Sequence, residues 1–469
     1  MAPHGNWWFY VWHRGYLGYF EETIRNLSGD PTFAIPYWDW TTLPEIPAAM
    51  FDGLLTPRDM GFEPYTGNLG RFTAFAKPAL EKYWNSLTPA QKNQLNVRGY
   101  TEFELLWNDV TGYSPKNQFG ISGNMGYAIT CGARYLTRDN PKLDKKTAYD
   151  VSPRIVHSGL LPKDFYSSDD KLSFTSSKTP SHNTQPDSST EFSILEGFPH
   201  NKVHNYIGGV GPIDPGPYGN MTNFLSPVDP IFFLHHSNMD RLWDVWTRKQ
   251  QALKLPWLPT GQDLETLSKE LFLFYVNGKG QYVGESKAGE YLNMDRFGYD
   301  YEPGFGEEII KAPEEVTTRA NQPSPVSKGT VQANNASVPV VADSIQKHID
   351  AKKPALFAKI TLPRPDMSSS LTREFDVFVG APDNAGELNE DSPHFAGTIA
   401  FFGKMPSMEG MPMDATFTVP LPNAPQAFAE ALAATPDRTA PANVKVRVVP
   451  SHGPREKMPT LKAVSIHSL

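Results

Sequence analysis

Large apolar residues recur at helical spacing in two long stretches of the chain. Between residues 7 and 27 they repeat every three or four positions, and turn residues at 29–31 end the run. The second stretch begins at Asp229, whose carboxylate can accept hydrogen bonds from free backbone amides, and Pro230 suits a first helical turn. From there to residue 246 one side is apolar. The pattern predicts two long amphipathic helices.

The segment between these helices is less regular. Shorter helical pieces are expected at 88–95 and 102–110, and long connections rich in Pro, Ser, Thr and Asp join them, such as residues 167–189. No internal repeat is visible. Together with the two long helices, this segment predicts an irregular, loop-rich helical domain.

The C-terminal part of the chain has a different pattern. Apolar and polar residues alternate in short runs between turn residues, at 356–362, 374–379, 397–402, 415–419 and 444–449. This alternation predicts a small β-sandwich. Residues 312–345 are rich in Pro, Ser, Thr and Asn without periodicity, which is typical of a linker. The predicted organisation is a helical domain over 1–311, a linker over 312–345 and a β-sandwich over 346–469.

Composition excludes several classes of protein. The net charge of -8 and the sequence pI of about 5.9 argue against nucleic acid or an anionic membrane as the main partner. No stretch reaches the ~20 apolar residues of a membrane helix, and the N-terminus lacks the pattern of a signal peptide. Cys131 is the single cysteine, so disulfides within the chain are impossible. These features predict a soluble, cytoplasmic protein.

Histidine is scarce, with 12 in 469 residues, yet several histidines lie in tight groups. His200 and His204 are four positions apart, which on a helix places both rings on one face, close enough to bind one ion. Two histidines at this spacing also occur by chance, and the alternative is that both are surface or helix-capping residues. The pair alone therefore gives weak support for a metal site.

Two further pairs of histidines lie in or beside the long helices. His235 and His236 are adjacent and point about 100° apart on a helix, so one could bind metal while the other supports it or packs as a plain core residue. His4 and His13 are nine positions apart, which would place them on opposite faces of a single helix. We therefore expect His4 on a turn before the helix.

The type of ligand narrows the metal. Di-iron sites in helical bundles need carboxylates with Glu-x-x-His, and zinc peptidases need His-Glu-x-x-His; neither pattern occurs. Sites built of imidazoles alone suit copper or zinc. The chain also has 10 Trp, 19 Tyr and 28 Phe, and these are concentrated around the histidines. The sequence predicts an aromatic-lined interior site for one of these metals.

Five short segments stand in order along the helical part. They are His13-Arg14-Gly15-Tyr16-Leu17 with Phe20-Glu21, Pro36-Tyr37-Trp38-Asp39-Trp40, Asp229-Pro230-Ile231-Phe232-Phe233-Leu234-His235-His236, Asp240-Arg241-Leu242-Trp243 and Gly298-Tyr299-Asp300-Tyr301-Glu302. They resemble the copper-A and copper-B signatures and the closing tyrosine motif of tyrosinases, catechol oxidases and molluscan haemocyanins. This resemblance to the type-3 dicopper family implies a mainly α fold, in which a four-helix core holds two copper ions.

The resemblance also implies which residues bind each metal. Copper A would take its second and third ligands from His4 and His13, and copper B would be held by His200, His204 and His236. His235 and Asp240 would orient these ligands without binding metal themselves, and for Asp240 and its neighbour Arg241 a simple surface ion pair is the alternative.

The family's first copper-A histidine precedes the position that His4 occupies, and this chain has no counterpart there. A missing N-terminal segment is the favoured explanation. Replacement by His157 or His182 and an incomplete copper A are the alternatives. Cys131 has no histidine nearby in the sequence, so the thioether crosslink found in part of the family is not assigned.

The resemblance favours a tyrosinase, which uses dioxygen to oxidise monophenols to o-diphenols and these to o-quinones. A monophenol has a reference pKa of about 10, so hydroxylation needs a group that takes its proton. Glu196 and Asn201 resemble the pair that holds an activating water in family members that act on monophenols; otherwise they are ordinary polar residues. Catechol oxidase without monophenolase activity and a haemocyanin-like dioxygen carrier are the alternatives.

Residues 373–379, with the sequence Arg-Glu-Phe-Asp-Val-Phe-Val, resemble the C-terminal domain of plant and some bacterial polyphenol oxidases. The resemblance suggests a lid over the copper site, with Phe395, Phe401 or Phe402 in the phenol pocket. A sandwich that packs on the outside or mediates homo-oligomers is the alternative.

Overall fold

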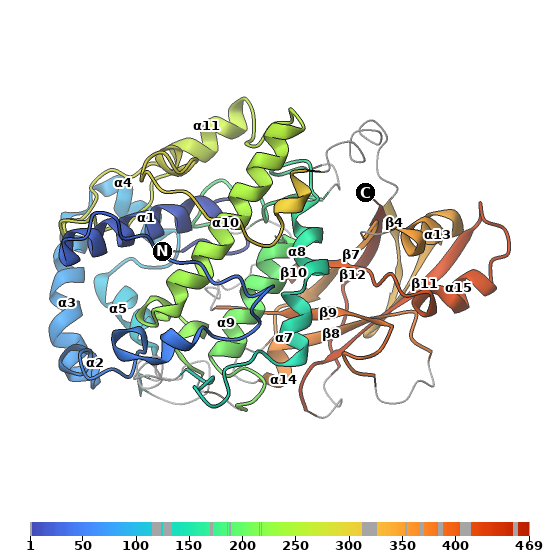
Figure 1. Cartoon of the computed structure of the whole chain (residues 1–469), viewed down its shortest axis with the longest axis horizontal. Coiled ribbons are helices and arrows are strands. Elements are labelled where there is room, and N and C mark those ends of the chain that lie inside the picture. Colours follow the sequence, from blue (N-terminus) through green and yellow to red (C-terminus); the bar gives the residue numbers. More distant parts are fainter. Residues whose placement is uncertain are drawn as a thin grey trace.

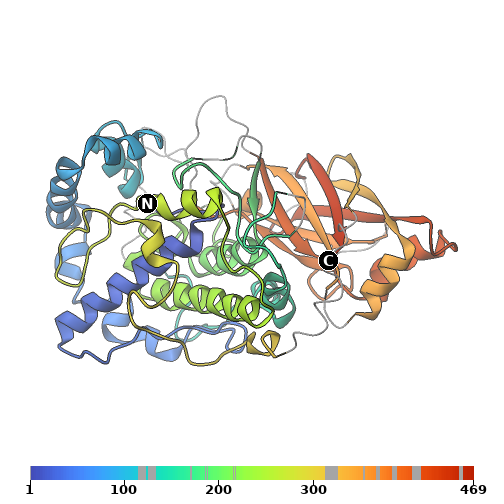
Figure 2. The same ribbon diagram turned by 90° about the horizontal axis from the view of Figure 1, so that it is seen from above.

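A computed structural model describes residues 2–114, 123–124, 134–168, 172–184, 186, 189–214, 216, 218–311, 326–351, 354–365, 370–382, 388–403, 414–453 and 458–468. Helices gather in one part of the molecule and long strands in the other (Figure 1), and the two parts lie end to end along the long axis when seen from above (Figure 2). None of the helices in these ranges is long and apolar enough to cross a membrane. The predicted combination of a helical part with C-terminal sheets is confirmed.

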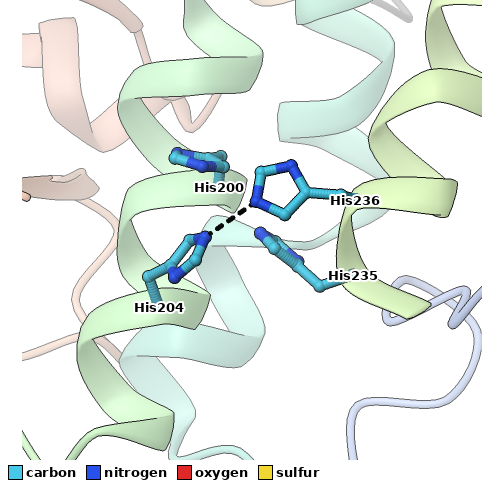
Figure 3. Close-up of side chains that lie close together, drawn as sticks. All are labelled: His200, His204, His235 and His236. Atoms are coloured by element: carbon cyan, nitrogen blue, oxygen red, sulfur yellow. Dashed lines mark hydrogen bonds between the residues drawn. The ribbon is translucent and has the colours of Figure 1, made fainter. Parts of the chain in front are cut away.

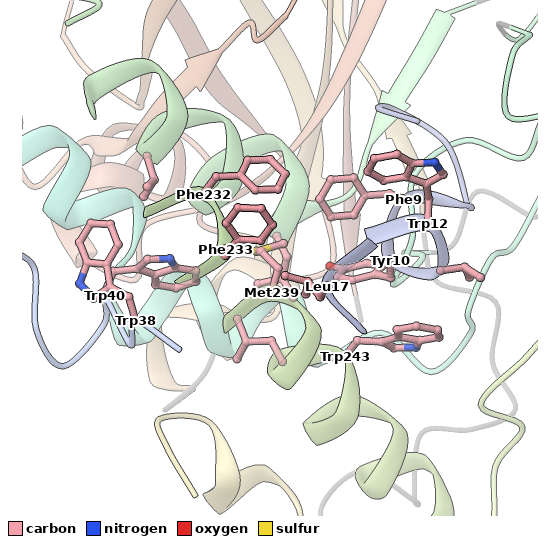
Figure 4. Packing of buried hydrophobic residues seen from close by; sticks show 14 of the residues in the cluster. Phe9, Tyr10, Trp12, Leu17, Trp38, Trp40, Phe232, Phe233, Met239 and Trp243 are labelled. Atoms are coloured by element: carbon pink, nitrogen blue, oxygen red, sulfur yellow. The ribbon is translucent and has the colours of Figure 1, made fainter. Parts of the chain in front are cut away.

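Two long helices form the centre of the helical part, as predicted. α1 (Phe9–Ser28) ends where Gly29 adopts a left-handed conformation with φ of 71° and donates its N–H to the Arg25 carbonyl. α10 (Ile231–Ala252) begins just after Asp229, whose Oδ1 accepts the Ile231 N–H at 3.1 Å, as expected of a capping carboxylate. Large aromatic side chains from both helices pack into one core (Figure 4).

Shorter helices surround this pair. The α-helices described in the helical part are α2 (Glu63–Thr66), α3 (Leu69–Ser86), α4 (Pro89–Asn96), α5 (Phe103–Thr111), α7 (Lys145–Asp150), α8 (Pro153–Leu160), α9 (Asn201–Ile207) and α11 (Gln262–Lys269). A π-helical turn, η3 (Glu196–His200), leads directly into α9. The 3-10 turns are η1 (Ala48–Phe51), η2 (Gly53–Leu55), η4 (Asn220–Thr222), η5 (Ser226–Val228), η6 (Ala288–Tyr291), η7 (Glu307–Ile309) and, among the strands, η8 (Pro425–Phe428).

The predicted short helices at 88–95 and 102–110 correspond to α4 and α5. α4 begins with a capping box, in which Thr88 accepts the Gln91 N–H and Gln91 accepts the Thr88 N–H. α3 was not predicted, although its apolar residues recur at helical spacing, because Pro78 lies inside it. Cys131 lies outside the described residues.

Two five-stranded sheets form the C-terminal part, with strand orders β3-β10-β7-β12-β4 and β5-β6-β11-β8-β9. Their strands are β3 (Ser189–Phe192), β4 (Val326–Lys328), β5 (Thr330–Gln332), β6 (Asn335–Val341), β7 (Leu356–Pro363), β8 (Glu374–Val379), β9 (Phe395–Ala400), β10 (Asp414–Pro420), β11 (Pro441–Pro450) and β12 (Ala463–Ser468). Helices α13 (Ala342–Asp350), α14 (Ser370–Arg373) and α15 (Ala429–Ala433) accompany them, and a separate ribbon pairs β1 (Tyr113–Ser114) with β2 (Gly123–Asn124).

All five strands predicted from alternation are present. The predicted mainly α fold class, however, does not account for the two five-stranded sheets. Strands β4, β5 and β6 fall inside the segment 312–345, for which the sequence predicted an aperiodic linker. The reason is visible in β6, where Ala336, Val338 and Val340 are buried while the residues between them face outward. Small and β-branched residues alternate there, and Pro339 between them hides the pattern. The division into two domains stays a prediction.

The helical part contributes directly to the C-terminal core. β3 comes from the helical region and pairs in parallel with β10, and the Phe192 ring stacks on Phe417 with centroids 4.9 Å apart. Lys202 of α9 and Glu374 of β8 also form a fully buried ion pair. Burial raises the pKa of Glu374, but the charge of Lys202 outweighs it and lowers the pKa to about 2. Breaking a buried pair leaves an uncompensated charge, so this pair and the stacked rings join the two parts in the arrangement described.

Phe417→Ala should destabilise the protein by about 3–5 kcal/mol, because it opens a cavity in a fully buried core between both parts. The urea midpoint of the intrinsic tryptophan fluorescence transition measures this. Phe75→Ala is the matched control: Phe75 is 60% exposed, and its loss should shift stability by no more than about 0.5 kcal/mol. Equal midpoints for the two variants would show that the C-terminal core is not packed as described.

Candidate metal centre

Four histidines from two helical segments meet in the interior. His200 ends η3 and His204 lies in α9, while His235 and His236 come from the first turns of α10 (Figure 3). One ring nitrogen from each residue lies within 4.8 Å of the others, and all four side chains are buried. The Nε2 atoms of His204 and His236 are 3.1 Å apart. The two pairs seen in the sequence therefore form one cluster.

His4 and His13 join this cluster from the N-terminal side. α1 begins at Phe9, so His4 lies before the helix, as expected. The His13 ring stacks on His236 with centroids 4.1 Å apart, and the His4 ring lies 5.4 Å from His200 and 5.7 Å from His13. The structure thus brings together six histidines from three separate segments.

The interior keeps these six rings uncharged. Burial lowers the pKa of every one of them, to about 3 for His13 and His204 and well below the ordinary histidine value for the rest. Neighbouring histidines lower the pKa values of the others further. A neutral imidazole has one protonated nitrogen and one lone pair, and a metal ion binds the lone pair.

Backbone carbonyls determine which nitrogen is protonated in two of the rings. His13 Nδ1 lies 2.7 Å from the Phe9 carbonyl oxygen, and His204 Nδ1 lies 2.6 Å from that of Met221. A carbonyl oxygen only accepts, so each Nδ1 must donate. The lone pair of both rings is then on Nε2, toward the cluster.

A side-chain amide determines the same tautomer in His200. The Asn201 Nδ2 donates to the Ala400 carbonyl at 3.0 Å, which fixes the orientation of the amide. The Asn201 Oδ1 is 2.9 Å from His200 Nδ1 and accepts its proton. His200 therefore also directs a lone pair from Nε2. Histidines that bind metals in proteins are held through the other ring nitrogen in this way.

His235 has the opposite arrangement. The Trp40 indole Nε1 lies 3.1 Å from His235 Nδ1, and an indole nitrogen can only donate. His235 Nδ1 must accept, so the proton of the neutral ring is on Nε2. Neither nitrogen keeps a free lone pair for a metal. His235 therefore lies in the cluster, but in this tautomer it cannot bind a metal ion.

The cluster contains several buried nitrogens that no described residue satisfies. These are Nε2 of His13, His200 and His235 and Nδ1 of His236. A buried polar atom without a partner costs about 1–3 kcal/mol. Metal ions would satisfy the lone pairs among them, and a donor set of neutral imidazoles suits copper or zinc. The residues present therefore fit a metal centre.

The two histidines considered as replacements for the absent ligand lie elsewhere. His157 bonds to Glu308, and its ring lies against Phe305. His182 Nδ1 bonds to Glu270 at 2.5 Å, and its ring contacts Phe272. Among the ring contacts of the described residues, neither histidine meets a member of the cluster. These contacts give no support to a replacement ligand.

Glu196 is fully buried beside the N-terminal turn. Its two oxygens accept the Gly5 N–H at 2.6 Å and the Ser176 hydroxyl at 2.5 Å. Burial raises the pKa of Glu196 to about 8, and these two hydrogen bonds only partly offset the effect. Glu196 is therefore not a solvated carboxylate at the protein surface. It holds the turn next to His4, and it can exchange a proton near neutral pH.

Asp240 joins three segments of the helical part. Its oxygens accept Arg14 Nε at 2.7 Å and the hydroxyls of Tyr299 and Tyr301 at 2.6 and 2.7 Å. The surface ion pair considered as the alternative is wrong, because Asp240 and the adjacent Arg241 are both buried. Among the described residues, Asp240 forms no hydrogen bond with a cluster histidine. Its partner Arg14 is the chain neighbour of His13. The sequence named the two tyrosines in a motif but did not predict that they bond to Asp240.

A single phenylalanine of the C-terminal part covers the cluster. The Phe402 ring lies 4.3 Å from the His204 ring, 5.1 Å from His4 and 5.3 Å from His200. The other two candidates lie elsewhere: Phe395 packs on Phe378 and Tyr149, and Phe401 packs on Phe375 and Phe417. Of the three phenylalanines that the sequence offered, only Phe402 contacts the histidines.

Several curated relatives of the chain are plant enzymes. The chain is 23% identical over 432 residues to chloroplastic polyphenol oxidase II of Ipomoea batatas, covering 85% of this chain and 57% of the relative. It is 25% identical over 308 residues to chloroplastic catechol oxidase B of Solanum tuberosum, covering 65% and 39%. The chain spans about half the length of these relatives. Their chloroplastic location contradicts the cytoplasmic location expected from composition, and that prediction is wrong.

Solved structures of related proteins match the chain at low sequence identity. A latent aurone synthase (polyphenol oxidase) matches with 18% identity and a TM-score of 0.47, over 99% of this chain and 77% of that one. A family model described as the common central domain of tyrosinase matches residues 2–249, which is more than half of the chain. That range contains every residue of the histidine cluster. The chain belongs to the tyrosinase family.

Proposed function

We propose that this chain is a dicopper phenol oxidase that uses dioxygen to oxidise monophenols to o-diphenols and o-diphenols to o-quinones. The observation that carries the proposal is the cluster of six uncharged histidines, five of them buried and His4 partly exposed, three of which direct an Nε2 lone pair into the cluster. The family match supports copper over zinc. Copper ions bound there would exchange electrons with dioxygen and with the phenol.

The tautomers divide the cluster into ligands and a supporting residue. His4 and His13 would hold copper A, and copper B would be held by His200, His204 and His236. His235 would not bind metal, because its Nδ1 accepts the Trp40 N–H. Its protonated Nε2 could instead donate to a ligand of the metals. In this proposal α1, α8, α9 and α10 form the four-helix core that the sequence predicted.

Glu196 is the residue we assign to proton transfer from a monophenol. A phenol with a pKa of about 10 is protonated at neutral pH, and a base with a pKa near 8 can accept its proton with modest cost. The Gly5 N–H bond holds the carboxylate next to His4. Asn201 would complete the arrangement, but its amide is now bonded to His200 and Ala400. Its role in phenol activation requires that the Ala400 segment move.

The C-terminal sheets are assigned as a lid over the site, with 1–311 as the catalytic domain and 346–469 as the lid. Phe402 lies where a phenol ring would meet the histidines. Asn201, Asn205 and Arg364 donate hydrogen bonds to the carbonyls of residues 400–403 and hold this segment in place. A closed site of this kind is also what a dioxygen carrier would need, so activity after opening separates the enzyme from the carrier.

The full chain should bind two copper ions, and His236→Ala should bind at most one. The reason is that His236 supplies a copper-B ligand and its ring stacks on His13. Copper per chain after dialysis, measured by atomic absorption, tests this. His394→Gln is the matched control, because the His394 ring bonds only to the Val379 carbonyl among the described residues. Two coppers in both variants would contradict the ligand assignment.

Glu196→Gln should lower the ratio of monophenol to catechol turnover by about 10²-fold or more, since it removes the proposed base. In the unmodified chain this ratio should rise as pH increases through about 8, because Glu196 accepts a proton only when ionised. Oxygen consumption with tyrosine and with catechol measures both. Glu191→Gln, which alters a partly exposed carboxylate paired with Lys359, is the control. A pH-independent ratio that is unchanged in Glu196→Gln would contradict the role assigned to Glu196, and a ratio near zero in the unmodified chain would leave a catechol oxidase.

Phe402→Ala should increase catechol oxidation by the full chain by roughly 10- to 150-fold. Burying a phenylalanine ring contributes about 1.5–3 kcal/mol to the closed state, and each 1.4 kcal/mol is about tenfold. Phe395→Ala serves as the control, because Phe395 is also buried but packs away from the histidines. Copper binding without catechol turnover in Phe402→Ala would favour the dioxygen carrier.

A further inference from the structure

A cavity of about 540 Å³ lies at the boundary between the helical part and the C-terminal part, where α7 and α8 face the sheets (Figure 1). Tyr149, Arg154 and His157 line it from the helical part, and Phe395 and Pro422 are among the residues that line it from the other. None of the described residues that line it belongs to the histidine cluster. The volume is within the range of small-molecule sites in proteins, about 300–1,000 Å³.

Arg154 supplies the only permanent positive charge among the described lining residues. The side chain is half-buried, and its hydrogen bonds are long. Nη1 donates to the Tyr149 hydroxyl at 3.2 Å and to the Pro420 carbonyl at 3.4 Å, and Nη2 donates to the same carbonyl at 3.4 Å. Nε bonds to no described residue, so the guanidinium keeps donors for a further acceptor.

The charge of Arg154 has no counter-ion among the described residues. Burial lowers its pKa, and Tyr149 is the only described residue that raises it. An arginine side chain nevertheless stays protonated in a protein. Glu308 bonds to His157 on the same side of the cavity, but it is not among the groups that act on Arg154. The cavity therefore contains a positive charge that an anionic ligand would neutralise.

The remaining walls of the cavity are mainly apolar. Four prolines, two alanines and Phe395 form most of them. The amide of Asn423 also lines the cavity, but its nitrogen already donates to the carbonyls of His348 and Ala351. Such walls suit an apolar body, and a guanidinium binds a carboxylate through paired hydrogen bonds. A rigid aromatic body loses less conformational freedom on binding than an alkyl chain does.

We propose that this cavity is a second binding site, which takes a small aromatic carboxylate, and that Arg154 binds the carboxylate. The inference goes beyond the proposed phenol oxidase function and does not depend on it, because the cavity is separate from the histidine cluster. Its walls come from both parts of the chain. A bound ligand therefore contacts both parts and stabilises their arrangement.

The test compares two probes of the same shape, naphthylacetate and the uncharged naphthylacetamide, by calorimetric titration of the full chain. The acid should bind more tightly by roughly tenfold or more. Its affinity should be the same before and after copper loading, which separates this cavity from the metal centre. Arg154→Gln should remove the preference for the acid, and Arg154→Lys should keep part of it. Arg71→Gln, which removes an exposed arginine of α3, is the matched control and should keep the preference.

A second variant fills the cavity and leaves Arg154 in place. Ala424→Phe should abolish binding of both probes, because Ala424 lines the cavity. This result does not depend on whether Arg154→Gln folds. Octanoate should bind more weakly than naphthylacetate, and the reverse order would overturn the aromatic body of the ligand. Absence of binding at millimolar concentration, equal affinity for acid and amide, or affinity that depends on copper would overturn the site itself.

Discussion

The site depends on six imidazole rings that are packed together without charge. Burial holds their pKa values far below the ordinary range, so the rings stay neutral and their lone pairs stay available. Carbonyls, an amide and an indole then select the tautomer of each bonded ring. Four other ring nitrogens have no partner among the described residues: Nε2 of His13, His200 and His235 and Nδ1 of His236. Buried polar atoms in proteins normally have partners, and bound metal would satisfy the lone pairs among these four.

The same helical segment serves the metal centre and the lid. His200 and His204 face the cluster, while the residues after each of them, Asn201 and Asn205, donate to the carbonyls of Ala400 and Phe401. Asn201 is bonded on both sides, since its oxygen also accepts the His200 proton. Movement of the C-terminal segment would therefore release a group that orients a proposed ligand, which couples opening of the site to its chemistry.

The sequence predicted the two long helices and the five alternating strands, because periodicity is a local property. The six clustered histidines were brought into one site by the family resemblance. The sequence did not predict that β6 lies in the supposed linker, since Pro339 masks the alternation of small residues. The sequence also did not predict the partners of Asp240. Tyr299 and Tyr301 are about sixty positions away, and their hydroxyls reach the carboxylate only in the folded chain. The tautomers depend on such distant partners as well. Trp40 stood in a recognised motif, but its bond to His235 is a tertiary contact.

The most direct test of the metal centre is anomalous diffraction at the copper absorption edge from crystals of the copper-loaded full chain. Two separate peaks are expected, one beside His4 and His13 and the other in contact with Nε2 of His200 and His204 and with His236. Neither peak should touch His235, whose Nδ1 accepts from Trp40. A single peak, or a copper bound to His235, would contradict the account of the site given by its hydrogen bonds.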